Sequence, residues 1–383
     1  MSSLPTLGAE QVAHSRALLS VITAEISANA GWLSFERYMQ MALYQPSLGY
    51  YSGGLEKFGK GGDFVTAPEI SPLFAQCVAN QAAQVLQATQ GDILELGAGT
   101  GQLAYDLLVT LYQLNQLPNY YYILEVSEYL TGIQQQKISQ LPEHLADRVI
   151  WLCSLPEWFN GFILANEVLD ALPVSLIKHT ENGLVELGVG LEDMHLTWAE
   201  KPMVSGPLFE QAKALRLPKN YQTEICLSAV GLINSLCECL KMGAILLIDY
   251  GFGEKEYYHL QRNEGTLMCH FRHYAHTNPL INLGLQDITA HVNFTQIATA
   301  GMDAGCELAG YTSQAHFLIN CGLSNILKET PADDIAQYLP LTTAANKLVS
   351  PAEMGDLFKA MALTKNLDMA LIGYTTGDKS HAL

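Results

Sequence analysis

A glycine-rich loop between an apolar run and a helical segment is the part of the sequence best suited to chemistry. The run 92–96 leads into Gly-Ala-Gly-Thr-Gly at positions 97–101, and a helical pattern begins at Gln102. Gly97 and Gly99 let the backbone turn sharply and approach a ligand without a Cβ in the way. The helix start after Gly101 directs unpaired amide groups at whatever binds there.

Two carboxylates beside this loop indicate what it holds. A dinucleotide fingerprint places its third glycine where this chain has Gln102, and it uses the helix end for a pyrophosphate. Glu95, two residues before the first glycine, would repel a pyrophosphate but suits a cationic amine or sulfonium. Glu125, at the end of the next apolar run, is placed to bind two ribose hydroxyls. These residues favour S-adenosyl-L-methionine over a nicotinamide or flavin dinucleotide and over a tight turn without a ligand.

The surrounding elements alternate as in a doubly wound α/β sheet. Short apolar runs predict buried parallel strands, and helical patterns separate several of them. We expect strands at 92–96, 121–126, 149–152, 162–165 and 244–248, with helices at 103–114 and 130–140. Before the sheet we expect a helix over 9–43, a turn-rich Gly/Tyr segment over 46–72 and a helix over 73–88. After it we expect helices at 295–300 and 354–361 and strands at 307–309 and 369–374. Insertions at about 174–242 and 253–294 are too long for crossovers and are expected over the ligand face.

Composition limits the class of protein. The 383 residues are 49% hydrophobic and 15% charged, which excludes a disordered chain, and the net charge of −18 disfavours nucleic acid or an anionic membrane as partner. No apolar run approaches the ~18 residues that cross a bilayer. The eight scattered cysteines and the lack of Lys or Arg in residues 1–15 favour reduced thiols in a cytoplasmic protein of bacterial type, or in the mitochondrial matrix if a targeting segment has been removed.

Four separated motifs resemble one family. They are Gly-Asp-Phe-Val-Thr-Ala-Pro-Glu-Ile-Ser at 62–71, Asn-Glu-Val-Leu-Asp-Ala-Leu-Pro at 166–173, Ile-Asp-Tyr-Gly at 248–251 and Gln-Asp-Ile-Thr-Ala-His-Val-Asn-Phe at 286–294. With the glycine loop, they resemble the MidA family of class I S-adenosyl-L-methionine-dependent methyltransferases. Eukaryotic members of that family are mitochondrial assembly factors for respiratory complex I and methylate arginine on a partner subunit.

The resemblance implies a fold, a cofactor and a set of contacts. It implies a seven-stranded, Rossmann-like doubly wound sheet with inserted substrate-recognition elements and a helical N-terminal extension. We expect residues 1–90 to cover the cofactor and 91–383 to form the methyltransferase core. The third strand lacks the acid that many class I enzymes place near adenine, so Ser154 is the candidate there. The expected cofactor-binding residues are Phe64, Thr66, Glu95, Gly97, Gly99, Gly101, Glu125, Ser154 and Asn166.

The candidate catalytic residues are carboxylates. Glu167 and Asp170 follow the fourth predicted strand three residues apart, so one helical turn would place them on one face, although Asn166 and Asp170 are also ordinary helix-start residues. Arginine stays cationic at any working pH. Carboxylates can bind two guanidinium nitrogens, localise the charge there and leave the third nitrogen more nucleophilic. We expect Glu167, with Asp170 or Asp287, to do this for a basic or arginine-containing segment of a protein substrate.

Other functions and sites remain open at this stage. The same core could methylate a small molecule or lipid, or bind the cofactor as a non-catalytic assembly factor. A homodimer could use the insertions as contacts. His270, His273 and His276 invite a metal site, but neither helical nor strand spacing brings all three to one face, so no metal is expected.

Overall fold

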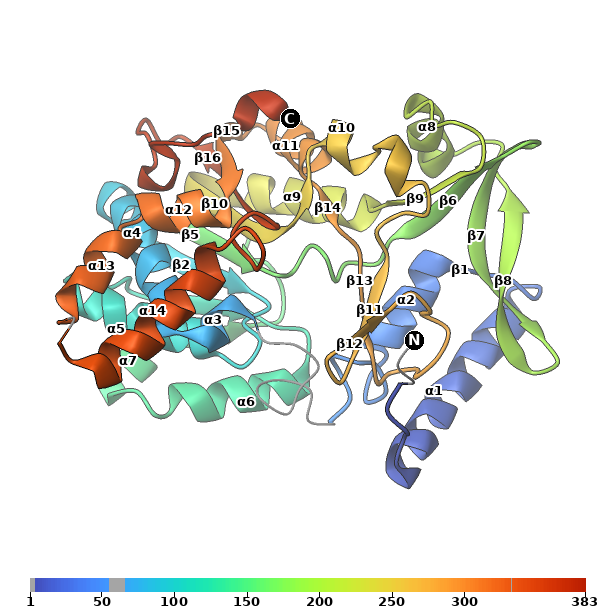
Figure 1. Ribbon diagram of the computed structural model, residues 1–383, viewed down its shortest axis with the longest axis horizontal. Coiled ribbons are helices and arrows are strands. Elements are labelled where there is room, and N and C mark those ends of the chain that lie inside the picture. Colours follow the sequence, from blue (N-terminus) through green and yellow to red (C-terminus); the bar gives the residue numbers. More distant parts are fainter. Residues whose placement is uncertain (1–3, 55–65, 332) are drawn as a thin grey trace. The chain divides into compact units, whose positions relative to one another are not determined.

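The computed structural model describes residues 4–54, 66–331 and 333–383, and its contacts divide the chain into two compact units (Figure 1). The first unit comprises Met1–Phe64, Asp170–Gly231 and Lys255–His291. The second unit comprises Val65–Leu169, Leu232–Glu254 and Val292–Leu383. Each unit is therefore assembled from segments far apart in the sequence. No helix among the described residues is long and apolar enough to cross a membrane.

The second unit is built on one large sheet. Its strand order is β15-β16-β10-β5-β2-β3-β4, and β14 pairs with β10 in addition. Strands β2, β3, β4, β5 and β10 run parallel to one another, whereas β16 is antiparallel to β10 and β15. The strands are β2 (Asp92–Leu96), β3 (Tyr121–Leu124), β4 (Val149–Leu152), β5 (Phe159–Asn166), β10 (Leu240–Phe252), β14 (Val292–Asn293), β15 (Glu307–Ser313) and β16 (Phe358–Lys365).

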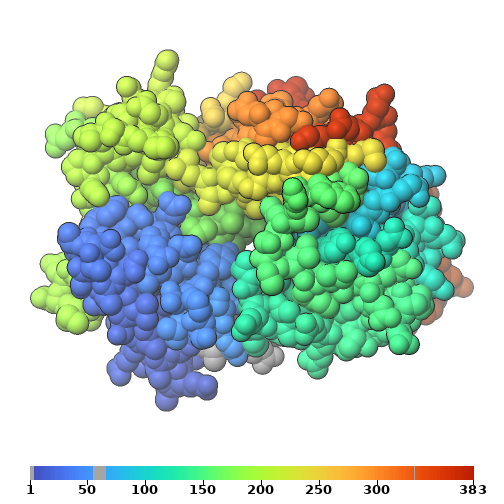
Figure 2. Space-filling view, turned by 180° about the vertical axis from the view of Figure 1, so that it is seen from behind, coloured from blue at the N-terminus to red at the C-terminus, as the bar shows by residue number. Residues whose placement is uncertain are grey.

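Helices pack on both faces of this sheet, as the alternating sequence predicts. The helices are α3 (Ala67–Ile70), α4 (Pro72–Thr89), α5 (Gln102–Gln113), α6 (Glu128–Ile138), α7 (Glu143–Ala146), α9 (Leu227–Cys239, which begins in the first unit), α10 (Glu254–Tyr257, at the boundary), α11 (Phe294–Asp303), α12 (Gln314–Asn320), α13 (Leu323–Glu329) and α14 (Ile335–Val349). Two short 3₁₀ helices follow, η3 (Ile372–Tyr374) and η4 (Ser380–Ala382). The segment from α5 to β5 contributes the teal and green surface in Figure 2.

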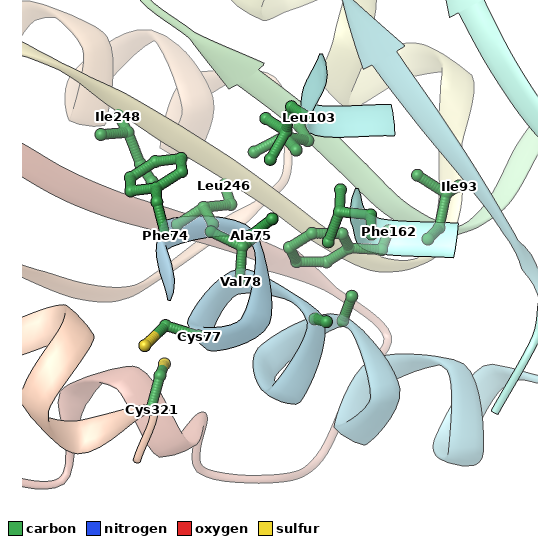
Figure 3. Close-up of a cluster of buried hydrophobic side chains, with 14 of the residues drawn as sticks. Phe74, Ala75, Cys77, Val78, Ile93, Leu103, Phe162, Leu246, Ile248 and Cys321 are labelled. Atoms are coloured by element: carbon green, nitrogen blue, oxygen red, sulfur yellow. The ribbon is translucent and has the colours of Figure 1, made fainter. Parts of the chain in front are cut away.

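The core of the second unit lies between α4 and the sheet. Phe74 and Val78 of α4 are buried with Phe162 of β5 and Leu246 and Ile248 of β10 (Figure 3). Full burial of side chains of this size contributes about 1.5–3 kcal/mol each. On the opposite face α11 packs against β16 so closely that a Cβ on Gly301 would meet Leu363 at 2.5 Å.

The first unit holds two smaller sheets. One has the order β1-β7-β6-β9 with β8 paired to β7, and the other has the order β12-β11-β13. Their strands are β1 (Leu33–Ser34), β6 (Ser175–Thr180), β7 (Gly183–Glu192), β8 (His195–Pro202), β9 (Tyr221–Ile225), β11 (Met268–Phe271), β12 (Tyr274–His276) and β13 (Asp287–Thr289). Its helices are α1 (Ala9–Ala28), α2 (Phe35–Tyr44), α8 (Pro207–Ala214) and η2 (Leu260–Arg262). Apolar residues of α1 and α2, including Leu18, Ile22 and Phe35, pack against Leu176 and Val189 of β6 and β7.

Three expected elements are wrong: the helices over 9–43 and 354–361 and the strand over 369–374. The helix expected over 9–43 is interrupted, because Ala30 and Gly31 adopt left-handed conformations with φ of 56° and 83° and the chain then forms β1. The segment Met354–Met361 is not helical, since Phe358 begins β16, which is paired on both edges. Pairing between two strands overrides the helical tendency of this alanine-containing run.

The last expected strand, 369–374, is instead pinned to α4 by side-chain amides. Ile372 and Gly373 donate their backbone N–H groups to Gln84 and Gln81 at 3.0 and 2.9 Å, and Gln84 donates to the carbonyl of Ala370 at 2.9 Å. Because glutamine side chains take these backbone groups, the segment needs no strand partner. The expected division at residue 90 remains a prediction.

Candidate cofactor and active site

The glycine loop follows β2 and adopts the geometry that its composition predicts. Gly97, Gly99 and Gly101 have φ of 60°, 53° and 82°, a region that residues with a side chain rarely occupy. A Cβ on Gly99 would meet nothing within 4 Å, whereas a Cβ on Gly101 would press on the backbone of Gln134 at 3.2 Å. The loop is therefore open at Gly99 and tightly packed against α6 at Gly101.

Gln134 of α6 joins three parts of the site, and sequence reasoning missed it. Its side-chain amide nitrogen donates to the carbonyl of Gly99 at 3.0 Å and to Glu125 at 2.9 Å, and its oxygen accepts from the indole of Trp151 on β4 at 3.0 Å. Its side chain is fully buried, so each of these bonds satisfies a group that water cannot reach. A polar residue at a core-facing position of α6 is the only signal that could have found it.

Glu125 lies directly after β3, as expected for a ribose ligand. Its carboxylate accepts from Gln134 and, at 2.9 Å, from the backbone N–H of Ser127. Burial raises the pKa of Glu125, and these hydrogen bonds counteract the rise. The carboxylate is thus oriented before any ligand binds.

Glu95 is buried and does not face solvent. Its side chain points into the core of the second unit and accepts from the Tyr121 hydroxyl at 2.7 Å. Burial raises the pKa of Glu95 to about 7, and the hydrogen bond from Tyr121 opposes that rise. Its contact with the cofactor remains a prediction.

The end of β5 lies beside the glycine loop. Leu96 of β2 pairs with Ala165 of β5, so Gly97 neighbours Asn166 and Glu167, and a Cβ on Gly97 would meet Val168 at 3.2 Å. Asn166 donates to Glu167 at 3.2 Å, and its own side-chain oxygen is buried without a partner among the described residues. A buried acceptor of this kind suits a donor from a ligand.

Glu167 occupies a strained backbone conformation. Its φ is 53°, in the left-handed region, and its N–H donates to the carbonyl of Ile248 at 2.9 Å. The following turn is held to β10 because Asp249, which is buried, accepts from the backbone N–H of Leu169 at 2.9 Å. Non-glycine residues in this region cost about 1–3 kcal/mol and cluster at functional sites.

Two further carboxylates expected at the site, Asp170 and Asp287, belong to the first unit and are buried there. Tyr51 donates to both oxygens of Asp287, at 3.0 and 3.1 Å, and its ring stacks on Tyr44 with centroids 5.4 Å apart. Burial raises the pKa of Tyr51, and the charges of Asp287 and Asp170 add to the rise. These aspartates therefore share one aromatic environment.

The remaining expected residues are less informative. Thr66 precedes α3 and accepts from the backbone N–H of Glu69 at 3.0 Å. Ser154 lies in an exposed bend just after β4. Phe64 lies outside the described residues. His270 and His276 lie on β11 and β12, with His273 in the turn between them.

Prediction for Glu95. A carboxyl whose pKa rises from 4.5 to about 7 on folding stabilises the fold fully below pH 4.5, and this contribution is lost as the pH rises through 7. Relative to Glu95→Gln, the wild type should lose about 3 kcal/mol of unfolding free energy between pH 4.5 and 8. Urea unfolding at several pH values measures this. Tyr121→Phe should enlarge the loss, and parallel wild-type and Glu95→Gln curves would refute the assignment.

Prediction for Gln134. Gln134→Leu removes the partner of Gly99, Glu125 and Trp151 at once, and we expect the affinity for S-adenosylhomocysteine to fall about 10-fold or more. Trp151→Phe is the matched control, because it removes a single hydrogen bond and keeps a ring, and its effect should be smaller. Calorimetry measures both. Unchanged affinity of Gln134→Leu would show that the loop holds its shape without the amide.

The geometry fits S-adenosyl-L-methionine, and comparisons with known proteins agree. Residues 77–312 match the model of a family described as "Putative S-adenosyl-L-methionine-dependent methyltransferase". A crystal structure of a Burkholderia thailandensis protein bound to S-adenosylhomocysteine is 45% identical, with a TM-score of 0.96 over 100% of both chains. A native crystal structure from the same organism is 44% identical, with a TM-score of 0.94 over 100% of both chains.

More distant relatives carry a functional name. "Protein arginine methyltransferase NDUFAF7, mitochondrial" of Danio rerio is 27% identical, over 93% of this chain and 88% of the relative. The protein of the same name from Xenopus tropicalis is 29% identical, over 90% and 84%. The family match spans more than half of the chain and agrees with the cofactor loop, so the chain belongs to the MidA family of S-adenosyl-L-methionine-dependent methyltransferases and has their α/β methyltransferase fold.

Proposed function

We propose that this methyltransferase transfers a methyl group to an arginine side chain of a protein partner. The observation that carries the proposal is Glu167, a carboxylate held at φ 53° at the end of β5, next to the cofactor loop. The names of the distant relatives support the same substrate class. We also infer that the seven strands on the main path of the large sheet form the methyltransferase core.

When bound, the cofactor supplies an electrophilic methyl group on a sulfonium sulfur, and the neutral thioether that remains is a good leaving group. The protein then has to hold the nucleophile in the orientation that allows transfer. Glu167 binds two nitrogens of the guanidinium and localises its positive charge there. The third nitrogen would be left more nucleophilic toward the methyl group that a bound cofactor supplies. As the N–C bond forms and the S–C bond breaks, S-adenosylhomocysteine is released, and the methylated nitrogen then loses its proton to water, so no general base is needed before transfer.

The strain at Glu167 fits this role. A glycine there would relieve the backbone, so the proposed role of the carboxylate would offset the cost of this conformation. The neighbouring Asn166 orients it through the 3.2 Å hydrogen bond, and the oxygen of Asn166 remains for a ligand donor. In the first unit, Asp170 and Asp287 around Tyr51 are proposed to recognise cationic groups of the partner segment.

Prediction for Glu167. Glu167→Gln keeps the shape and removes the charge, so turnover should fall about 100-fold or more while affinity for S-adenosylhomocysteine changes little. Glu167→Gly should lose turnover as well, yet raise the free energy of unfolding by about 1 kcal/mol, because the left-handed strain disappears. Methyl-transfer rates, calorimetry and urea unfolding measure the three quantities.

Gln90→Gly is the matched control for the stability part. Gln90 has φ of 51° at the end of α4 and is exposed, so glycine should stabilise it by a similar amount without changing turnover. Full turnover of Glu167→Gln would remove Glu167 from the mechanism.

Prediction for the substrate. A lysate of cells that lack the protein is incubated with the purified chain and S-adenosyl-L-methionine labelled in the methyl group. We expect label in a protein band and, after hydrolysis, in N-methylated arginine. Label in lipid or small molecules would contradict the arginine proposal and favour methylation of those substrates. Cofactor binding without any transfer would instead favour a non-catalytic assembly factor.

A further inference from the structure

Glu69 lies beside the cofactor loop, although neither its position in the sequence nor the comparisons assign it a role. Its carboxylate accepts a hydrogen bond from the hydroxyl of Thr100, which stands between Gly99 and Gly101. The backbone of α3 fixes its place, because Thr66 precedes this short helix and Ser71 begins α4 with a side-chain cap on Leu73. Glu69 is half-buried in the second unit.

Within residues 4–54, 66–331 and 333–383, the charge of Glu69 has no ion-pair partner. None of the salt bridges among the described residues includes it, and Thr100 is its single side-chain hydrogen-bond partner there. Its charge also acts on another acid, the buried Asp106, which accepts from Gln102 at 2.7 Å. Burial raises the pKa of Asp106, and the charge of Glu69 adds to that rise. The hydrogen bond from Gln102 and the charge of Lys137 oppose the rise at Asp106, whereas no described cation forms an ion pair with Glu69.

The other two acids beside the loop are already engaged. Glu95 points into the core and binds Tyr121, and Glu125 binds Gln134 and the backbone of Ser127. Gln134 also holds Gly99 from the side of Glu125, the proposed ribose ligand. Thr100, the next residue, turns its hydroxyl to Glu69. The loop thus has a ribose side and a Glu69 side, with open space at Gly99 between them.

We infer that Glu69 binds the α-ammonium group of the cofactor's amino-acid end, with Thr100 orienting the carboxylate. The inference rests on the proposed cofactor site at the glycine loop and names the residue that binds the α-ammonium group of the ligand. A carboxylate that accepts one hydroxyl bond keeps lone pairs for an ammonium, and a bond between two charged groups is among the stronger hydrogen bonds. The ammonium group then pairs with a carboxylate for which the described residues supply no ion pair.

The test compares two ligands that differ by the amino group alone. Calorimetry measures the binding of S-adenosylhomocysteine and of its deaminated analogue, which keeps the carboxylate, to the wild type and to Glu69→Gln. We expect Glu69→Gln to bind S-adenosylhomocysteine about 10-fold or more weakly and the deaminated analogue nearly as well as the wild type does. Thr100→Val, which keeps the shape without the hydroxyl, should show the same selectivity with a smaller loss.

Glu143→Gln is the control for net charge. Glu143 is an exposed acid in α7, which has four residues as α3 has, and its replacement should change neither affinity. Equal losses for both ligands in Glu69→Gln would show that Glu69 only shapes the loop and would overturn the inference, as would no loss for either. Failure of the wild type to bind S-adenosylhomocysteine at all would instead refute the cofactor site itself.

Discussion

The parallel pairing of β5 with β2 is the constraint on which the candidate site depends. It aligns Leu96 with Ala165, so the glycine loop and the Asn166–Glu167 turn leave the sheet side by side. On its other edge β5 pairs with β10, and Asp249 of β10 fixes the backbone after Glu167. The glycine loop and the proposed guanidinium ligand are thus positioned by central strands of the sheet, and ligands commonly bind at the carboxyl ends of such strands.

Buried polar groups give this part of the sheet its shape. Gln134, Glu95 and Asp249 are almost completely inaccessible to solvent, and each is satisfied by partners on neighbouring elements. An unpaired buried donor or acceptor costs about 1–3 kcal/mol, so these residues restrict the loop to few arrangements. The oxygen of Asn166, at the end of β5 beside the glycine loop, has no partner in the described part of the chain and is suited to a ligand donor.

The acids of the protein fall into groups with different surroundings. Glu95 is held in the core, Glu125 is oriented by hydrogen bonds, and Glu69 accepts from Thr100 without an ion pair among the residues that the structure describes. In the first unit Asp287 shares its environment with Tyr51 and Asp170. The overall charge of −18 is compatible with a cationic partner, but the local surroundings, and not the total, assign roles to individual acids.

The sequence alone determined the parallel strands, the glycine loop and the family, because apolar runs, glycine spacing and short motifs are local patterns. It misplaced the helix at 354–361 and the strand at 369–374, because strand pairing and the amides of Gln81 and Gln84 act across long stretches of chain. Only the tertiary structure revealed Gln134 and the contact of Glu69 with Thr100, since an ordinary polar residue becomes informative when folding buries it beside a loop. The left-handed conformation of Glu167 also depends on the tertiary structure. It occurs where β5 ends and Glu167 donates its N–H to Ile248 of β10, and no local sequence pattern predicts it.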